Sequence, residues 1–126
     1  MSEVRFFRCK HCGNLVGIIT GSGVPLVCCG EEMEELVAGT VEASREKHIP
    51  VISRDGNRVI IEVGSVAHPM IAAHYIEWIF IQTKHGGQRK RLSPNDAPKA
   101  TFLLDDDELV AAYAYCNLHG LWKADA

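Results

Sequence analysis

The sequence predicts a mainly-β protein, with a small metal-clamped segment at the N-terminus and an antiparallel β-sandwich after it. Four of the five cysteines lie within the first 29 residues. After them, short runs rich in Val, Ile and aromatic residues alternate with Gly, Asn and Pro turn signals. No stretch has a convincing helical period. A boundary is expected near residue 37, which gives domains over residues 1–37 and 38–126.

Composition narrows the class of protein. A chain of 126 residues is one ordinary domain or two small ones. A hydrophobic content of 47% with 23% charged residues fits a soluble globular chain. The net charge of −3 argues against nucleic acid as a partner. No apolar run reaches the ~20 residues of a membrane helix, and the first residues lack the features of a signal peptide. A cytoplasmic location is therefore expected.

The clustered cysteines point to metal or redox chemistry, because a reducing compartment disfavours structural disulfides. The motif Cys9-x-x-Cys12-Gly13 is typical of a metal knuckle, in which a tight turn aims two thiolates at one ion. A Gly-Ser-Gly turn over residues 21–23 returns Cys28 and Cys29 to it. Neighbouring side chains of an extended chain point to opposite faces, so this adjacent pair needs a local distortion to bind one ion.

The identity of that metal stays open at this point. A segment of under 40 residues buries little apolar surface, so a bound ion is the expected source of its order. Four thiolates suit zinc in a structural knuckle, and they also suit iron, which can cycle one electron. Spacing alone does not distinguish the two metals.

The second domain is predicted as a set of short strands joined by tight turns. Asp55-Gly56 and Gly86-Gly87 are strong turn signals. Val59, Ile61 and Val63 alternate with more polar positions, which predicts one buried face. The segment from His68 to Ala73 has room for a single helical turn. The expected strands cover residues 49–53, 58–63, 74–83, 88–92, 100–104, 109–115 and 121–123.

The longest predicted strand, 74–83, carries apolar side chains on both faces. Strict alternation places Ile76, Trp78 and Phe80 together on one of them. The other face then carries Tyr75, Ile79 and Ile81 around Glu77. Strands of this length and spacing favour an antiparallel β-sandwich.

A lone thiol and several imidazoles lie at predicted strand–loop junctions, where the loops at one end of a sandwich build sites. A single histidine at such a place is usually a surface residue or a satisfied core residue. Four of them with a cysteine indicate a shared metal instead. The candidates are His48, His68, His74, Cys116 and His119. By contrast, His11 and His85 have no partners in the pattern and are expected to be solvated.

These residues lie in motifs that resemble a known family. Glu46-Lys47-His48, Ala67-His68-Pro69-Met70, His74-Tyr75-Ile76 and Cys116-Asn117-Leu118-His119-Gly120 resemble the signature of superoxide reductases. The segment with Cys9, Cys12, Cys28 and Cys29 resembles the desulforedoxin-type domain that the two-iron members, the desulfoferrodoxins, carry in front. The resemblance covers essentially the whole chain, in the same order.

The resemblance implies a fold and two cofactors. An immunoglobulin-like sandwich would carry an iron with four histidines in a plane and one axial cysteine. The implied ligands of this iron are His48, His68, His74, His119 and Cys116. A second iron would be held in the N-terminal domain by Cys9, Cys12, Cys28 and Cys29.

The resemblance also implies an activity, the one-electron reduction of superoxide to hydrogen peroxide without release of oxygen. The N-terminal iron would be an accessory electron-transfer site, a rubredoxin-like protein the electron donor, and the assembly a homodimer. Glu46 resembles the glutamate that closes the ferric site, although a plain surface carboxylate is the other interpretation. Lys47 is the candidate for local attraction of an anion, because the overall charge of −3 repels one.

Two other functions remain as alternatives. The chain could be a non-catalytic electron carrier that uses the four-cysteine iron alone, with the sandwich as a docking module. It could also be a zinc-clamped binding domain without redox chemistry. Neither alternative explains why His48, His68, His74, Cys116 and His119 occur together. Iron quantitation separates the three, with two irons per chain for the reductase, one for the carrier and none for the zinc domain.

Overall fold

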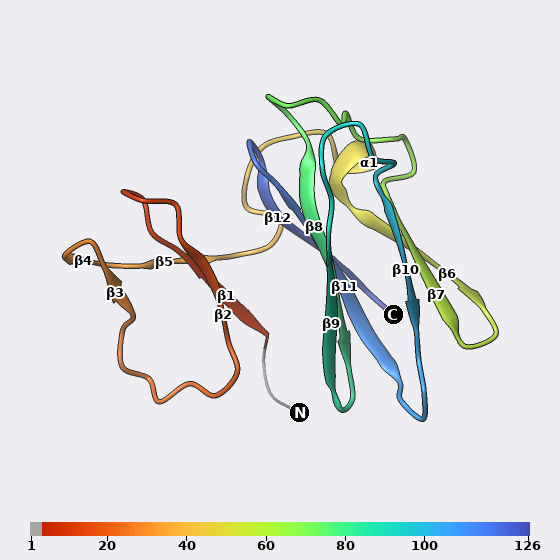
Figure 1. Ribbon diagram of the computed structural model, residues 1–126, viewed down its shortest axis with the longest axis horizontal. Coiled ribbons are helices and arrows are strands. Elements are labelled where there is room, and N and C mark those ends of the chain that lie inside the picture. The colour runs from red at the N-terminus through yellow and green to blue at the C-terminus, as the bar shows by residue number, and fades with distance from the viewer. Residues whose placement is uncertain (1–3) are drawn as a thin grey trace. The chain divides into compact units, whose positions relative to one another are not determined.

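A computed structural model describes residues 4–126 of the chain (Figure 1). It divides into two compact units, the first ending at Val37 and the second spanning Ala38–Ala126. The first three residues of the predicted N-terminal domain lie outside the described residues. Strands dominate both units, and the predicted mainly-β class is confirmed. Within residues 4–126, no helix is long and apolar enough to cross a membrane.

The first unit is a small sheet with a short hairpin. Its sheet has the antiparallel order β2-β1-β5, and β3 pairs with β4. Among its described residues, the buried hydrophobic side chains are those of Phe6, Phe7 and Cys9. So little buried apolar surface gives a weak core. The strands are β1 (Arg5–Arg8), β2 (Leu15–Ile18), β3 (Val27–Cys28), β4 (Glu31–Glu32) and β5 (Glu34–Leu36).

The second unit contains two antiparallel sheets with a shared core. One sheet has the order β10-β7-β6 and the other the order β12-β11-β8-β9. A four-residue helix, α1 (Arg45–His48), precedes the first strand. The strands are β6 (Pro50–Asp55), β7 (Arg58–Val63), β8 (Ile76–Thr83), β9 (Gly86–Arg91), β10 (Lys99–Leu103), β11 (Leu109–Cys116) and β12 (Gly120–Asp125).

The core between these sheets is made by alternating strand residues. Val59, Ile61 and Val63 of β7 are almost completely buried, as their alternation in the sequence predicted. They belong to one cluster with Ile79 and Ile81 of β8. Opposed apolar faces of this kind stabilise a sandwich because each removes the surface of the other from water.

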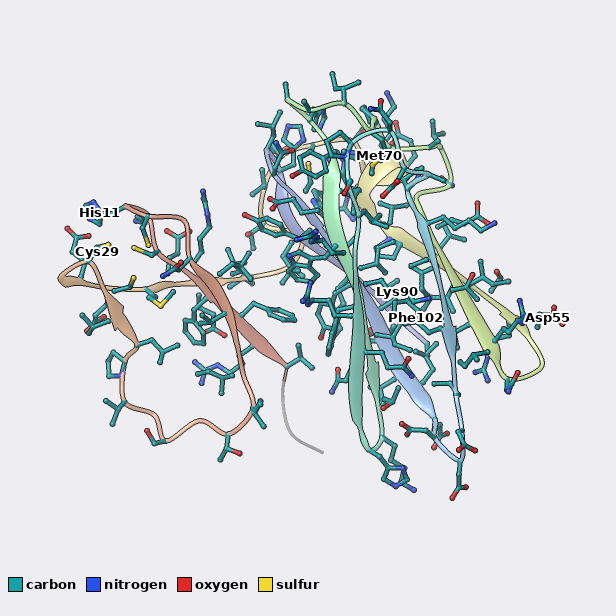
Figure 2. The ribbon with its side chains drawn as sticks, in the orientation of Figure 1. His11, Cys29, Asp55, Met70, Lys90 and Phe102 are labelled. Carbon is teal, nitrogen blue, oxygen red and sulfur yellow. The ribbon has the colours of Figure 1, made fainter. Side chains whose placement is uncertain are left out.

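Side chains of β9 join one sheet to the other at the edge. The Lys90 ammonium donates a hydrogen bond to the Thr101 carbonyl of β10 and lies over the Phe102 ring, 5.4 Å from its centroid. Figure 2 shows Lys90 and Phe102 side by side. The Gln88 amide donates to the Leu103 carbonyl at 2.8 Å. These contacts cover backbone carbonyls that an edge strand would otherwise leave unpaired.

The predicted face of Ile76 is wrong. This residue lies in the core with Ile79 and Ile81, rather than sharing a face with Trp78 and Phe80. Pairing between β8 and β11 shifts at this point, so that Tyr115 faces Trp78 while Cys116 faces Ile76. A β-bulge adds one residue to a strand and reverses the alternation beyond it. The bulge therefore turns Ile76 inward beside Cys116.

Both predicted hairpin turns are displaced along the chain. Asp55 pairs with Arg58, so the turn residues are Gly56 and Asn57. Thr83 pairs with Gly86, which leaves Lys84 and His85 as the second turn.

Gly87, predicted for that second turn, has a packing role in β9 instead. A Cβ atom on Gly87 would lie 2.3 Å from the Phe80 ring. The glycine is therefore needed so that the Phe80 ring can lie across β9.

The helical turn also lies elsewhere than predicted. It covers Arg45–His48, while the stretch from His68 to Ala73 is irregular and ends in a tight turn bridged between Ile71 and His74. Gly64, directly after β7, lies very close to the backbone of α1. A Cβ atom on Gly64 would be only 2.6 Å from the Glu46 carbonyl oxygen. Gly64 thus permits the contact that holds α1 against the sandwich.

Candidate metal centres

The first candidate centre is built from two turns of the N-terminal unit. The backbone N–H of Gly13 donates to the Cys9 carbonyl at 3.0 Å, and Gly13 has a φ of 80°, so the chain turns tightly after Cys12. The sulfur atoms of Cys12 and Cys28 are 3.6 Å apart. Four thiolates about 2.3 Å from one ion have edges of about 3.8 Å between sulfurs. The ligand atoms of Cys9, Cys12, Cys28 and Cys29 all lie within 4.8 Å of one another.

The distortion expected of the adjacent pair is present at Cys29. Its φ is 53°, in the left-handed region that non-glycine residues rarely adopt. This conformation follows directly after β3 and brings both neighbouring sulfurs to one point. The chain therefore accepts backbone strain to collect four thiols, which is the mark of a functional constraint.

The pKa values of the thiols within this group are shifted in opposite directions. The pKa of the Cys9 thiol falls to about 6, chiefly because the backbone N–H of Cys12 donates to its sulfur. The pKa of the Cys29 thiol rises to about 12, chiefly because of hydrogen bonds with the Cys12 and Cys9 sulfurs. One thiol ionises readily and the last resists. A bound metal ion would offset the repulsion between neighbouring thiolates and displace the remaining protons.

The second candidate centre gathers side chains from four segments at one end of the sandwich. His48 is the last residue of α1, and Cys116 is the last residue of β11. His68 and His74 lie in the connection between β7 and β8, and His119 lies in the turn between β11 and β12. Met70, in the same connection, marks this end in Figure 2, while Asp55 marks the opposite hairpin tip.

The four imidazole rings form a closed square. Successive ring centroids are 4.6 Å apart from His48 to His68, 4.6 Å from His68 to His74, 5.0 Å from His74 to His119 and 4.9 Å from His119 to His48. Neighbouring rings stand at 78–84° to each other. The diagonal pair, His48 and His74, is 6.3 Å apart and only 29° from parallel. The arrangement is that of four planar donors around one centre.

The buried Cys116 adds a thiol to this cluster of rings. Its sulfur belongs to one donor group with His48, His68 and His74, whose ligand atoms lie within 4.8 Å of one another. The same sulfur is 3.9 Å from Nδ1 of His119, which is 3.1 Å from Nε2 of His48. All five sequence candidates therefore lie together, with four imidazoles and one thiol in a single cluster.

Hydrogen bonds to backbone carbonyls fix the tautomers of two rings. Nδ1 of His48 lies 2.7 Å from the Ser44 carbonyl, and Nδ1 of His68 lies 2.6 Å from the Pro69 carbonyl. A carbonyl only accepts, so both Nδ1 atoms carry the proton and both Nε2 atoms present a lone pair. Yet these two Nε2 atoms are 3.2 Å apart. Two lone pairs at that distance repel, and a shared cation resolves the conflict.

Burial keeps these rings neutral. It lowers the pKa of His48 and of His74, and it lowers the pKa of His68 to about 4. Within residues 4–126, Nε2 of His74 is a buried polar atom without a hydrogen-bond partner. Burial also raises the pKa of the Cys116 thiol. Neutral nitrogens and a thiol that must lose its proton to ligate fit a soft or borderline metal such as iron, and the residues present fit the implied group.

Lys47 and Glu46 differ in their relation to this site. Burial is the largest cause of the lowered pKa of His48 and His74, and the charges of neighbouring histidines contribute as well. The Lys47 ammonium lowers the pKa of both rings further, so its electrostatic field reaches the ring square. The Glu46 side chain is exposed and stands outside the donor group. Its backbone carbonyl accepts the Val66 N–H at 2.9 Å, which holds the neighbouring loop.

Trp122 is a residue of the site that sequence reasoning missed. Its ring centroid lies 5.0 Å from that of His48, and its indole N–H donates to the His119 carbonyl at 3.0 Å. It therefore supports two of the four rings at once. A bulky aromatic residue three positions after a candidate ligand was the available signal.

The two remaining histidines lie outside both donor groups. His11 is exposed and pairs with Glu31 at 3.1 Å, and His85 is exposed and pairs with Asp107 at 3.3 Å. Both are accessible to water, as predicted.

Comparison with known proteins extends over both units. The desulfoferrodoxin family profile matches residues 40–125, and the profile of the desulfoferrodoxin N-terminal domain matches residues 2–36. A desulfoferrodoxin homolog from Archaeoglobus fulgidus is 47% identical, covering 98% of this chain and 99% of its own. A desulfoferrodoxin from Nitratidesulfovibrio vulgaris is 46% identical, covering 99% of this chain and 98% of its own.

A solved structure agrees with these sequence relatives. The superoxide reductase from Treponema pallidum is 42% identical and superposes with a TM-score of 0.84, covering 98% of this chain and 100% of its own. Both donor groups fall within the matched residues. The chain belongs to the desulfoferrodoxin family.

Proposed function

We propose that this protein is a superoxide reductase, which reduces superoxide with one electron and two protons to hydrogen peroxide and releases no oxygen. The observation that carries the proposal is the closed square of four imidazoles with a buried thiol in the same cluster. Relatives with this activity in their names support it, namely the solved superoxide reductase from Treponema pallidum and the superoxide reductase from Pyrococcus horikoshii. An electron carrier that used the four-cysteine centre alone would have no need of the square.

The proposed iron ligands are His48, His68, His74, His119 and Cys116. Ferrous iron, when bound there, would supply the one electron that superoxide takes up. The chain's part is to hold four neutral imidazoles and a single thiolate, which would leave the metal with a net positive charge that favours an anion. Carbonyl contacts from Ser44 and Pro69 fix two rings in the ligating tautomer.

Lys47 is proposed to attract superoxide toward the site formed by the four imidazoles and Cys116. In Lys47→Ala the second-order rate with superoxide should fall about three- to tenfold at low ionic strength, because one steering charge is lost. Iron content should not change, since Lys47 is not a proposed ligand. Stopped-flow or pulse-generated superoxide measures the rate. Lys84→Ala removes the same charge from the turn between β8 and β9, at the end of β8 away from His74, and should leave the rate unchanged. Equal rates for both variants and wild type would exclude the steering role.

Glu46 is proposed to close the oxidised site and to help peroxide leave. Its exposed side chain sits two residues before His48, on the same helical turn. In Glu46→Ala the absorption spectrum of the ferric site and its pH dependence should change, while the first electron transfer to superoxide keeps its rate. Optical titration from pH 5 to pH 10 tests this. A ferric spectrum with an unaltered pH profile would show that Glu46 does not ligate.

The N-terminal unit is proposed as an accessory domain over residues 1–37, followed by a catalytic domain over residues 38–126. Iron held by Cys9, Cys12, Cys28 and Cys29 would accept or store an electron. A rubredoxin-like protein is the proposed donor, since the consumed electron must come from outside the chain. A homodimer and a cytoplasmic location complete the proposal.

Product stoichiometry tests the proposed function. With an excess of reductant, each superoxide consumed should give one hydrogen peroxide and no oxygen. Oxygen evolution, with one peroxide per two superoxides, would indicate dismutation and contradict the proposal. Metal analysis of the purified protein should give two irons per chain. One iron per chain would favour an electron carrier, and none would favour a zinc-held binding domain.

A further inference from the structure

Asn117 follows Cys116 directly and begins the turn that carries His119. The proposed reaction gives Asn117 no role. Its side-chain amide makes two hydrogen bonds to the loop of His74. Nδ2 donates to the Ala73 carbonyl at 3.0 Å, and Oδ1 accepts the Tyr75 N–H at 2.9 Å. Its own backbone N–H donates to the Tyr75 carbonyl at 3.2 Å. Asn117 therefore binds the residues before and after His74.

The chemistry of these partners fixes which way the amide faces. The Tyr75 N–H only donates, so it must meet the amide oxygen, and the Ala73 carbonyl only accepts, so it must meet the amide nitrogen. Few side chains present a donor and an acceptor on one short, rigid plane. Aspartate has no donor when ionised, and serine has one oxygen for two partners. The site uses both functions of an asparagine.

His74 depends on such bonds more than its neighbours do. The rings of His48 and His68 are held directly, each through Nδ1 and a backbone carbonyl. His74 is held through its backbone, by the two hydrogen bonds exchanged with Ile71 and by the Asn117 amide on either side. Its Nε2 has no hydrogen-bond partner among the described residues.

We propose that Asn117 is a positioning residue, which fixes His74 relative to Cys116. It is the chain neighbour of Cys116 and the hydrogen-bond partner of the loop that carries His74, so it ties two proposed ligands on distant segments into one unit. The inference rests on the proposed iron site. Partners outside the ligand shell set ligand orientation, and their loss typically lowers metal affinity about 10- to 100-fold.

The test compares Asn117→Leu with wild type in the full-length protein. Leucine keeps the volume of the side chain and removes both amide hydrogen bonds. Asn57→Leu, in the exposed turn between β6 and β7, is the matched control. The readouts are iron affinity by competition with a chelator and the position of the thiolate-to-iron absorption band of the ferric site. Absorption of the four-cysteine centre in the same sample serves as the internal reference.

Asn117→Leu should bind iron at the imidazole site about 10- to 100-fold more weakly. Its thiolate-to-iron band should move, while the four-cysteine absorption and the control variant stay unchanged. A wild-type affinity together with a wild-type band in Asn117→Leu would overturn the inference and leave the proposed function standing. Wild-type protein that takes up no iron at the imidazole site would instead refute the proposed function itself.

A second variant covers the case in which Asn117→Leu does not fold. Asn117→Ser keeps a small polar side chain whose single hydroxyl cannot serve both Tyr75 and Ala73. It should show a smaller loss of affinity and a shifted band. If Asn117→Ser has wild-type values for both, the amide has no positioning role.

Discussion

Replacing Cys116 with serine should lower the rate of superoxide reduction by more than about 100-fold, because removal of a ligand exceeds the 10- to 100-fold typical of its outer partners. Cys116 is fully buried, and its sulfur belongs to one donor group with His48, His68 and His74. A serine hydroxyl does not ionise near neutral pH and gives no soft donor to iron. Peroxide formation at a fixed flux of superoxide measures the loss.

The same sample carries its own control for folding. Absorption of the four-cysteine centre should persist, since its ligands lie in the other unit. Ala114→Ser is a matched variant, because Ala114 is also fully buried and belongs to the same core cluster as Cys116. It adds a hydroxyl to the core and should keep both iron and activity. Comparable losses in Ala114→Ser and Cys116→Ser would mean that polarity in the core, rather than ligation, is responsible.

The iron-free sandwich should lose stability as pH falls from about 6.5 toward 4. Burial lowers the pKa of His68 from 6.5 to about 4, and burial lowers the pKa of His48 and His74. Above pH 6.5 both folded and unfolded chains hold neutral rings, and the stabilisation is complete. Below that pH the unfolded chain takes up protons first, so unfolding becomes easier. His68 alone accounts for about 3 kcal/mol over this range.

Denaturant unfolding of the chelator-treated protein at several pH values measures this loss. Both tryptophans, Trp78 and Trp122, lie in the second unit, so their fluorescence reports on the sandwich. Between pH 6.5 and 5 the free energy of unfolding should fall more steeply with pH in wild type than in His68→Gln. The substitution removes the proton uptake of one histidine, which accounts for up to about 1.4 kcal/mol per pH unit. A free energy of unfolding that is the same at pH 7.5 and pH 5 contradicts the prediction. Loading with iron should restore stability, since the metal competes with the protons.

The sequence predicted the buried face of a strand correctly where apolar and polar residues alternate along a strand that has no bulge. Val59, Ile61 and Val63 identified the core face of β7 without help from other strands. It failed at Ile76, because a bulge depends on how β8 pairs with β11 and leaves no local signal. It also failed for α1, since a four-residue helix has no period to detect and is held by the backbone approach at Gly64.

The candidate ligands were found from residue type and motif, whereas their support was not. Five donors at strand ends were visible in the sequence because imidazole and thiol side chains are few. Their orientation depends on contacts with ordinary groups, such as the Ser44 and Pro69 carbonyls, which carry no compositional signal. Trp122 and Asn117 likewise gain their roles only when distant segments meet.

The unequal cores of the two units imply different orders of events when the protein acquires its metals. Among the described residues of the first unit, the buried hydrophobic side chains are Phe6, Phe7 and Cys9, too few to order a chain unaided. Uptake of an ion and folding are then one step there, and a strong chelator reverses both. The sandwich instead has a cluster of buried apolar side chains, drawn mainly from β7, β8, β10 and β11, that needs no ion. The second metal should therefore enter a domain that is already folded, and its exchange should not require that domain to unfold.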